Sequence, residues 1–579
     1  MCRRHGDTSP SSQPEATVPS VTRTATGPLS VPRYRALWIA AIFSNVGSFL
    51  QTVAGSWLMK ELTDSSATWV GLMVASNLLP LLFLSLIAGV VADMFGKAKV
   101  MLWAQVLMGS AAAAMALATF LDVITPGLLL SLGLLLGVGM AFNLPAWQSL
   151  VPDLVPRGMV ASAVALNSAA FNVARAVGPA LGGLIVATAG PELGFGLNAL
   201  SYAGVIAVVA VLSRMLDQRG EEDASIGLIT NSIGLSIRYA RYTPAFRRVL
   251  GLVAAFAVTT AVIQAVLPNR TTELGGDETT YGILLGAMGT GALIAAFGRT
   301  RFDALRTGAA LPLTIAVFGI SGVVVGIAPN VTVAFGGMLV IGACWVLTLT
   351  VLNATTQLMT PHWVRGRAMS VYLLAFNGVL PLGSIGSGAL ADRIGAGSAM
   401  VLLSAATVGI GLTVRWFRVP RLDRVEAPEY DAARLVRPHV QTEGGPVMVI
   451  NTWRVQRSDL EDFLEVMNDI RMIRLRTGAY SWRLYRNTED PHRLSEVFLC
   501  ASWEEHLAQH RRTDDASVAR LRRATEFDRG DGPLSRHLIA VDVEHPQEWE
   551  SLRSAHEAFH QADGSVPLID VSDPASGYR

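Results

Sequence analysis

Long apolar runs dominate the first three quarters of the chain, and polar residues are confined to short stretches between them. A hydrocarbon core about 30 Å thick is spanned by around 20 helical residues. By that criterion the sequence predicts two sets of six membrane-spanning helices. The first set is expected near residues 36–59, 67–92, 98–121, 124–149, 159–189 and 193–215. The second set is expected near residues 249–270, 280–300, 309–328, 331–358, 367–391 and 396–418.

A different pattern begins near residue 445, where apolar and polar residues alternate over short segments. A period of two predicts half-buried strands, and a period near 3.6 predicts amphipathic helices. The expected order is strand, helix, strand, strand, helix, strand, at residues 447–455, 459–476, 480–487, 494–502, 504–526 and 537–543. We interpret this region as a small α+β ferredoxin-like domain of about 100 residues, which is a common domain size.

The two patterns together predict an all-α polytopic membrane protein with a small cytoplasmic α+β domain attached. Residues 1–32 contain no apolar run and are rich in Ser, Thr and Pro, so we expect them to be disordered. The expected order is this tail 1–32, an N-terminal six-helix half 33–216, a cytoplasmic central loop 217–248, a C-terminal six-helix half 249–420, a linker 421–444, the ferredoxin-like domain 445–545 and a C-terminal tail 546–579.

Composition agrees with a membrane protein that carries soluble segments. Of the 579 residues, 51% are hydrophobic and 16% are charged, and the mean hydropathy is +0.41. A soluble protein carries roughly a quarter charged residues. The first apolar run is too long and too late for a cleavable signal peptide. Cys2, Cys344 and Cys500 lack metal-ligand spacing, so we expect no disulfide, metal site or cofactor, and we expect no nucleic-acid partner.

Basic residues collect in alternate loops between the expected spans. Arg and Lys in short loops are retained on the cytoplasmic side of a membrane. The loops with this bias contain, among others, Lys97, Lys99, Arg157, Arg365 and Arg367. The intervening loops contain mainly acidic residues. We therefore expect both termini in the cytoplasm and the helices in the lipid bilayer of a bacterial inner membrane.

The short loop after the second span carries the most specific motif of the chain. From Gly89 to Lys99 it reads Gly-Val-Val-Ala-Asp-Met-Phe-Gly-Lys-Ala-Lys. Glycine permits a sharp turn, and a carboxylate such as Asp93 is costly at a membrane boundary without a partner. The run resembles the loop signature G-x-x-x-D-R-x-G-R-K of the major facilitator superfamily, with Met94 in place of an arginine. The resemblance makes these residues candidates for gating: Gly89, Asp93, Gly96, Lys97 and Lys99.

The two halves of the membrane part repeat one another. The segments from Gln148 to Gly158 and from Gln357 to Arg367 follow the fourth and tenth spans, and both contain Gln, Pro, Val, Arg and Gly in that order. A parallel six-plus-six repeat supports alternating access, in which two halves rock around a midplane site. Arg157, Arg365 and Arg367 therefore join the gating candidates. Small residues and loop prolines shared by any two membrane segments are the alternative explanation.

A second motif lies in the fifth span, from Ala174 to Gly183. It resembles the G-x-x-x-G-P-x-x-G-G motif of exporters in the superfamily, with Ala174 in place of the first glycine. The resemblance implies outward transport and an interface between halves at Gly178, Pro179, Gly182 and Gly183. Ordinary small-residue packing is the alternative. Arg175 is unusual here, because a guanidinium inside a span is costly without a partner. It is either an anion or substrate contact, or a residue that snorkels or pairs structurally.

The segments 143–152 and 54–71 resemble the subgroup that contains the bacterial enterobactin exporter and related transmembrane secretion effectors. This likeness covers most of residues 34–418. It implies secondary-active export of a siderophore, drug or other amphiphilic small molecule. The resemblance is also the basis for expecting proton coupling, since no titratable carboxylate lies well inside the spans. It further implies that Asp93 pairs, in one conformation, with a basic residue or helix N-terminus near residues 365–370.

Polar residues inside the spans predict the lining of a substrate cavity, because amides and hydroxyls in hydrocarbon face protein or water. The candidates are Asn45, Ser48, Gln51, Asn143, Trp147, Asn167, Arg175, Gln264, Asn353, Gln357, Tyr372 and Asn377. As a group they predict a mixed polar and aromatic pocket. Hydrogen bonding between helices, without contact to cargo, is the alternative interpretation.

The soluble region resembles the antibiotic-biosynthesis-monooxygenase-like domain, which is often dimeric. The likeness rests on Trp453, Glu496 and the runs 474–479, 482–485 and 502–510. No catalytic set is recognisable, so we expect a regulatory module or a homodimer contact, and no enzyme. A bifunctional protein whose tail modifies or senses the cargo is the alternative. His506 and His510 lie four residues apart on a helix, a spacing that could hold a metal. No third ligand is evident, so a solvated or interfacial pair is favoured.

Overall fold

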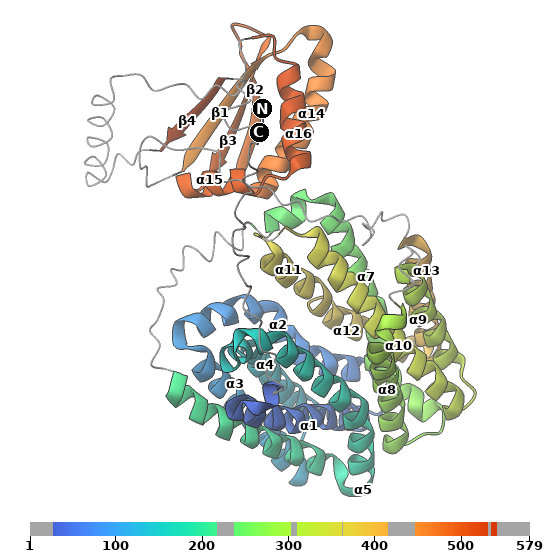
Figure 1. Cartoon of the computed structure of the whole chain (residues 1–579). Helices are drawn as coiled ribbons and strands as arrows, with labels where there is room; N and C mark the ends of the chain where they lie inside the picture. The colour runs from blue at the N-terminus through green and yellow to red at the C-terminus, as the bar shows by residue number, and fades with distance from the viewer. Residues whose placement is uncertain are drawn as a thin grey trace, which may run out of the picture.

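The computed structural model describes residues 27–216, 235, 237–302, 310–361, 363–414, 446–530 and 534–540. The expected linker 421–444 and terminal segment 546–579 lie outside these residues, as does most of the N-terminal tail and of the central loop. Within the described part, long helices form a bundle, and a small sheet with its own helices lies beyond one end of that bundle (Figure 1).

Five long helical stretches form the first half of the bundle. They are α1 (Pro32–Leu62), α2 (Ala67–Phe95), α3 (Lys97–Phe120), α4 (Pro126–Leu154) and α5 (Val160–Leu216). The 57-residue α5 is not one continuous helix, because Gly190 has a φ of +79° and Pro191 follows it. A positive φ is accessible to glycine without a Cβ clash, and proline lacks the amide hydrogen that would continue the helix. This break falls at the boundary that the sequence predicts between two spans.

The second half contains seven described helices. They are α7 (Pro244–Glu273), α8 (Glu278–Phe302), α9 (Ala310–Ile327), α10 (Val331–Met359), α11 (Arg365–Asn377), α12 (Leu380–Ile394) and α13 (Ala396–Thr413). Helices α11 and α12 belong to one membrane-length stretch, Ala368–Ile394. Across the described residues, eleven stretches are long and apolar enough to cross a membrane, one of them the 54-residue Ser162–Met215 that contains the Gly190 break. The number twelve stays a prediction.

The two halves meet along two pairs of helices. Helix α5 packs against α8, and α2 packs against α12. The backbones come close together at Gly183 of α5 and Gly282 of α8, where a Cβ added to Gly183 would lie 2.8 Å from the Gly282 Cα and 2.5 Å from the Glu278 carbonyl oxygen. No larger residue fits between these backbones without moving one of them, so the glycines set the distance between the halves here.

A four-stranded antiparallel sheet organises the C-terminal region. The strands are β1 (Val447–Arg454), β2 (Ser481–Arg486), β3 (Arg493–Cys500) and β4 (Leu534–Ile539), in the spatial order β2-β3-β1-β4. The helices are α14 (Leu460–Thr477), α15 (Trp503–Arg511) and α16 (Asp515–Glu526). Alternate residues of β1, such as Val447 and Val449, are buried. They pack in the same core as Phe498 of β3, which explains the period of two seen in the sequence.

The expected helix 504–526 is two helices in the structure. Helix α15 ends at Arg511, and α16 begins after Asp514, whose carboxylate accepts a hydrogen bond from the Ser517 amide at 2.8 Å. An aspartate at this position caps the first turn of a helix. A new helix therefore starts after Thr513 and Asp514, although the hydrophobic periodicity of the sequence predicts one continuous helix. The last strand begins three residues earlier than expected, and residues 541–543 lie outside the described residues.

The sheet region touches the second half of the bundle at the connection between α10 and α11. The guanidinium of Arg512, just after α15, lies 4.9 Å from the ring centre of Trp363 in that connection. Arg512 also forms hydrogen bonds with the Glu505 carboxylate, of 2.5 and 3.1 Å, and with the Thr477 carbonyl, of 2.8 Å. The contact of a cation with the face of an indole ring is favourable. Hydrogen bonds within the sheet region hold Arg512 in the position where it makes this contact.

Candidate functional site

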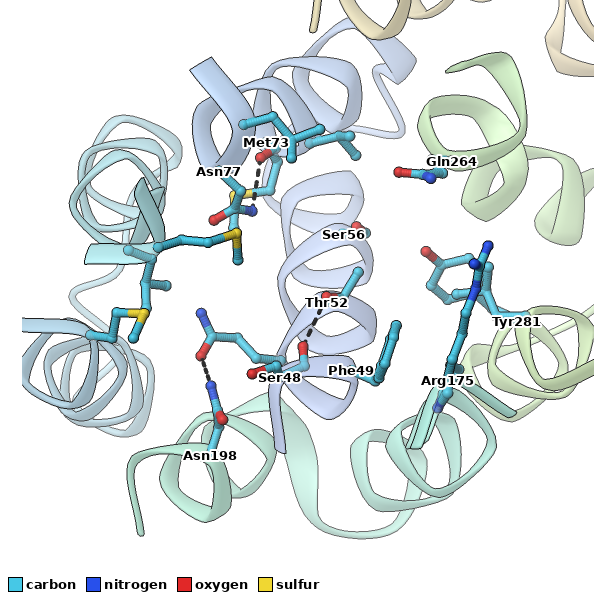
Figure 2. Close-up of a pocket in the computed structure, with 18 of the residues that line it drawn as sticks. Ser48, Phe49, Thr52, Ser56, Met73, Asn77, Arg175, Asn198, Gln264 and Tyr281 are labelled. Atoms are coloured by element: carbon cyan, nitrogen blue, oxygen red, sulfur yellow. Dashed lines mark hydrogen bonds between the residues drawn. The ribbon is translucent and has the colours of Figure 1, made fainter. Parts of the chain in front are cut away.

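A cavity of about 260 Å³ lies between the two halves of the helix bundle (Figure 2). Helices α1 to α5 contribute lining residues from the first half, and α7 and α8 contribute them from the second. The volume is near the lower end of the range for small-molecule pockets. A central cavity lined by both halves is where a transporter with two rocking halves would hold its cargo.

The lining of this cavity is mixed in character. Its polar members are Ser48, Gln51, Thr52, Ser56, Asn77, Asn198, Tyr202, Gln264 and Tyr281, together with Arg175. Its apolar members include Phe49 and four methionines, Met73, Met108, Met140 and Met288. Methionine side chains are flexible and polarisable, so they adapt to ligands of different shape.

Arg175 is the one charged residue among those described around the cavity. Its guanidinium lies 5.7 Å from the ring centre of Trp345, which belongs to α10 in the other half. Figure 2 shows the end of the Arg175 side chain directed into the cavity, beside the Tyr281 ring and toward Gln264. Arg175 therefore lies at the cavity and also contacts Trp345, so the choice between a contact with an anion or substrate and a structural pairing stays a prediction.

One polar network on the α1 side of the cavity joins helices of the same half. The Asn198 side-chain amide donates a hydrogen bond to the Gln51 side-chain oxygen. The hydroxyls of Ser48 and Tyr202 are 3.5 Å apart. Asn198 is fully buried, and a buried amide needs such partners. This network fixes α1 against α5 and leaves other polar groups, such as Gln264, directed into the cavity (Figure 2).

The structure places four of the twelve candidate cavity residues in the lining: Ser48, Gln51, Arg175 and Gln264. Several of the other candidates form hydrogen bonds with residues outside the lining. Asn143 accepts a hydrogen bond from Gln105 at 3.0 Å, and Asn167 accepts one from Tyr34 at 3.0 Å. Asn353 accepts one from Gln357 at 2.5 Å, and Asn377 donates one to the Leu373 carbonyl at 3.2 Å. Tyr372 is buried in the main core, Trp147 packs on a second core cluster, and Asn45 is half-buried on α1 outside the lining. The side-chain amides of Asn143, Asn167, Asn353 and Asn377 therefore form hydrogen bonds between or within helices, which is the alternative interpretation of these candidates.

Six polar lining residues were not among the candidates: Thr52, Ser56, Asn77, Asn198, Tyr202 and Tyr281. A signal existed for some of them. Ser56 lies eight residues after Ser48, which is the same face of a helix. Tyr202 lies four residues after Asn198, so the two also share a face.

A hydrogen-bonded contact closes one end of the bundle, at the turn between α1 and α2. The carboxylate of Asp392, at the end of α12, accepts hydrogen bonds from the Ala67 amide at 2.6 Å and the Thr68 amide at 3.0 Å. The Ser66 hydroxyl donates to the same carboxylate at 2.9 Å. These amides belong to the first turn of α2, so a carboxylate of one half caps a helix of the other half. We call this contact the Asp392 latch.

Further contacts between the halves surround the Asp392 latch. Lys60 donates to the Thr272 hydroxyl at 2.8 Å, and the Trp57 indole donates to Glu278 at 3.0 Å. The Trp57 ring also stacks on Tyr281, with ring centres 5.9 Å apart. Tyr281 lines the cavity, so the closed end and the cavity share a residue.

The gating candidates lie at the opposite end of the bundle or within α5. Gly96 has a φ of +88° and joins α2 to α3, as a turn glycine does. Lys97 pairs with Asp153 at 2.9 Å within one half, and the Arg365 Nε donates to the Thr360 carbonyl at 3.4 Å. Lys99 lies exposed on the first turn of α3. The remaining members, Gly89, Asp93, Arg157 and Arg367, lie in helices at this end, and their side chains are outside the described set.

The α5 motif divides its small residues between two neighbours. Gly178 and Gly182 face Phe49 and Leu50 of α1, in the same half. Pro179 and Gly183 face Gly282 of α8, in the other half. The motif therefore packs α5 on both sides, and only part of it lies between the halves.

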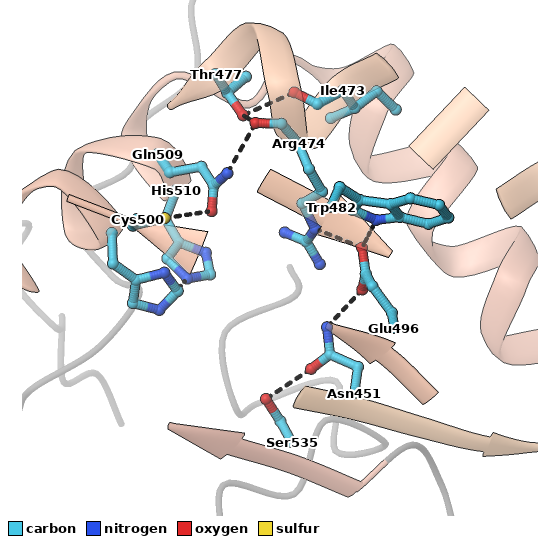
Figure 3. Close-up of polar contacts among 11 residues, drawn as sticks. Asn451, Ile473, Arg474, Thr477, Trp482, Glu496, Cys500, Gln509, His510 and Ser535 are labelled. Atoms are coloured by element: carbon cyan, nitrogen blue, oxygen red, sulfur yellow. Dashed lines mark hydrogen bonds and ion pairs between the residues drawn. The ribbon is translucent and has the colours of Figure 1, made fainter. Parts of the chain in front are cut away.

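The C-terminal region has a buried polar centre (Figure 3). Glu496 is fully buried and accepts from Asn451 at 2.7 Å, from the Trp482 indole at 2.8 Å and from the Arg474 Nε at 3.2 Å. Arg474 is itself only 4% exposed. Every oxygen of this carboxylate has a donor, which is the arrangement of a structural ion pair.

Three imidazoles gather beside this centre. The Nε2 atoms of His506 and His510 are 3.3 Å apart, and the ring of His537, from β4, is 4.9 Å from that of His506. Burial lowers the pKa of His506 to about 2 and that of His510 to about 3, and it also lowers the pKa of His537. His537 was not predicted to lie near His506 and His510, because it is far from them in the sequence. No group of three His, Cys, Asp or Glu side chains arranged for a metal occurs in the described residues.

Comparison with known proteins gives a family and relatives. The family model described as transmembrane secretion effector matches residues 23–546. The multidrug efflux pump Tap of Mycolicibacterium fortuitum is 25% identical over 419 residues, which cover 70% of this chain and all of that protein. The staphyloferrin A transporter of Staphylococcus aureus is 24% identical over 63% of this chain and 91% of its own. A solved structure of a POT family transporter in complex with 5-aminolevulinic acid shares the fold, with a TM-score of 0.55 at 14% identity over 66% of this chain and 95% of that one.

Proposed function

Because the chain belongs to the transmembrane secretion effector family of the major facilitator superfamily, we propose that it is a secondary-active exporter of an amphiphilic small molecule. The observation that carries this proposal is the cavity between the halves, lined by α5 on one side and by α7 and α8 on the other. Cargo would bind there and leave when the halves rock.

Rocking of the halves requires that their contacts break and reform. The Asp392 latch and the Lys60–Thr272 hydrogen bond join the halves at one end only. Each is a hydrogen bond of a charged group, Asp392 in one case and Lys60 in the other, and would be exchanged for bonds to water when the halves separate. The glycine contact between α5 and α8 contains no side chains that would interlock, so it can serve as the surface about which the halves turn.

We propose a twelve-span arrangement of two six-helix halves, in which Gly190 divides α5 into two spans. Basic residues such as Lys97 lie at the end opposite the Asp392 latch. The positive-inside tendency then places both termini in the cytoplasm and the latch on the outer face of the inner membrane. In this orientation Asp93 would gate the cytoplasmic end.

The relatives support efflux as the direction of transport. Tap is named as a multidrug efflux pump, and the Staphylococcus protein is named for the siderophore staphyloferrin A. A drug or siderophore is therefore the proposed class of cargo here. The family likeness also favours antiport against protons, which predicts that dissipating the proton gradient with an ionophore stops export.

Metabolite profiling of a deletion strain tests the exporter proposal. Loss of an exporter should raise the internal level of its cargo, and the wild-type gene should restore export. Gly183→Leu should fail to restore it, because a side chain there meets the backbone of α8. Gly204→Leu is the matched control in the same helix stretch, since nothing lies within 4 Å of the Cβ position at Gly204. Unchanged metabolite levels in the deletion strain would contradict export.

For the C-terminal region we propose a regulatory or dimerising module of the monooxygenase-like type. Its order β-α-β-β-α-α-β is that of a ferredoxin-like domain whose second helix is divided into α15 and α16. The buried Glu496 is fully engaged by donors, which favours a structural use of the polar centre over catalysis. Oxygen uptake by the full-length protein with a quinol would instead favour a tail that modifies cargo. Mass measurement of the full-length protein in nanodiscs tests dimerisation.

A further inference from the structure

We propose that the cavity takes an organic anion, an acidic group on an apolar body, with the acidic group bound by Arg175. This inference rests on the proposed function, because it names the class of cargo for that cavity. It concerns the charge of the cargo, on which the names of the relatives are silent.

The charge of Arg175 is not balanced by an acidic residue of the cavity lining. Arg175 lines the cavity, and no Asp or Glu does so among the described residues. Its contact with Trp345 is the one interaction of its guanidinium found among them. A cation in a low-dielectric interior is costly unless an opposite charge or water compensates it. A bound anion would supply the charge that the protein itself does not place there.

Trp345 contacts the Arg175 guanidinium without supplying a hydrogen-bond acceptor. The central carbon of the guanidinium lies over the Trp345 ring, 5.7 Å from the ring centre. An aromatic ring attracts a cation through its π-electrons and offers no oxygen to the N–H groups. A carboxylate or phosphate accepts two guanidinium N–H groups side by side. The contact with Trp345 is therefore compatible with an anion bound to the same guanidinium.

Tyr281 and Gln264 lie beside Arg175 at the cavity. Figure 2 shows the Tyr281 ring beside Arg175, with its hydroxyl toward the cavity, and the Gln264 amide directed into the same space. A phenol and an amide are both hydrogen-bond donors, which suits an anion. An acidic group at this point could be held from α5, α7 and α8 together.

The rest of the cavity suits an apolar body. Phe49, Met73, Met140 and Leu285 all line it. An aromatic or branched aliphatic portion would bury apolar surface there, and the methionines would accommodate variation in its shape. The expected cargo is thus amphiphilic, with its charge at the interface between halves.

Binding at Arg175 would also link cargo to conformation. Arg175 belongs to one half, whereas Trp345, Tyr281 and Gln264 belong to the other. An anion that contacts both sides binds best in the conformation that brings them together. Any ligand with such a preference shifts the balance between conformations.

The experiment uses the full-length protein in nanodiscs and three probes on one ring system. They are 2-naphthoate, its methyl ester and 2-naphthylmethylammonium, and calorimetry measures their binding. Wild-type protein should bind 2-naphthoate at least tenfold more tightly than either other probe. Arg175→Gln should weaken 2-naphthoate binding about tenfold and leave binding of the methyl ester unchanged. Arg175→Lys should keep part of the preference for 2-naphthoate, because lysine keeps the charge but not the planar donor fork.

The matched control is Arg248→Gln, which removes the same charge from an exposed position on α7 far from the cavity lining. It should bind all three probes like wild type. Equal or weaker binding of 2-naphthoate than of the ester by wild type, or an unchanged preference in Arg175→Gln, would overturn the inference. Either result would leave the exporter proposal standing if the deletion strain still accumulates cargo. Loss of that accumulation phenotype, with the naphthoate preference intact, would contradict the exporter proposal alone.

Discussion

The Asp392 carboxylate accepts the Ala67 amide hydrogen at 2.6 Å, and these two residues belong to different halves of the bundle. Asp392 lies in the last turn of α12, and Ala67 begins α2. The negative charge therefore sits at the positive end of a helix that is not its own. The proposed rocking of the halves would break this contact.

Asp392→Asn should loosen this end of the bundle. Asparagine keeps the size of the side chain but removes the charge and one acceptor, which costs about 1 kcal/mol for a helix cap. The ratio of open to closed molecules at this end should rise roughly fivefold. Spin labels at Leu121→Cys and Ser398→Cys, in a cysteine-free background, report the distance between the halves at this end. Both positions are exposed.

Asp277→Asn is the control for the latch variant. Asp277 also caps a helix, since it accepts the Thr280 amide at 2.9 Å, but both residues lie in the same half. Its replacement should weaken α8 locally without changing the spin-label distances. Identical distance distributions for Asp392→Asn and wild type would remove the latch from the mechanism.

The buried pair of Arg474 and Glu496 should be important for the fold of the C-terminal region. Glu496→Gln leaves Arg474 buried without its counter-charge, which typically costs 3–5 kcal/mol. Adding Arg474→Met should recover much of that loss, because the uncompensated charge is then gone. Hydrogen exchange of α14 and β3 peptides in the full-length protein measures the change. The exposed Glu489→Gln serves as a control, and equal protection in Glu489→Gln and Glu496→Gln would contradict the prediction.

Acid should destabilise the C-terminal region through its buried histidines. Their folded-state pKa values are lowered, to about 2 for His506 and about 3 for His510, chiefly by burial. The unfolded chain, with a histidine pKa near 6.5, therefore takes up protons first. The stability that these histidines contribute is complete above about pH 6.5 and is lost as the pH falls toward their folded-state pKa values. The loss is about 1.4 kcal/mol per pH unit for each histidine.

Hydrogen exchange of α15 at pH 7 and pH 5, corrected for the intrinsic rate, measures this dependence. Protection should fall at pH 5 in the wild type, and the fall should be smaller in His510→Gln. Replacement of the exposed His492 by Gln should leave the dependence unchanged. A pH-independent protection of α15 would show that the histidines are solvated in solution.

Sequence patterns predicted the membrane helices well, because burial in lipid leaves a long uninterrupted apolar run. They were less informative about which polar residue faces the cavity. Asn143 and Asn167 are as polar as Gln264, yet they bond to Gln105 and Tyr34. Which of these amides finds a protein partner depends on how helices far apart in the sequence pack. The same holds for His537, which reaches His506 only through the pairing of β4 with β1.

The Asp392 latch was not predictable for a related reason. The sequence shows an aspartate at the end of a span and says nothing about the helix that it caps. Positive φ at Gly96 and Gly190, in contrast, follows from local turn requirements, and glycines occupy both breaks. The helix breaks at Gly96 and Gly190 are therefore explained by local backbone conformation, whereas the Asp392 latch depends on how the two halves pack together.

Export should require the two halves to separate at the Asp392 latch. The most direct test of this requirement is a reversible bifunctional thiol reagent that links Leu121→Cys to Ser398→Cys across the halves, in cells whose release of the accumulated metabolite is followed. A pair within one half, Leu121→Cys and Leu193→Cys, is the control, since all three positions are exposed. We predict that linking across the halves stops export and that reduction restores it, while the control pair exports throughout. Export at the full rate with the halves linked would contradict the account.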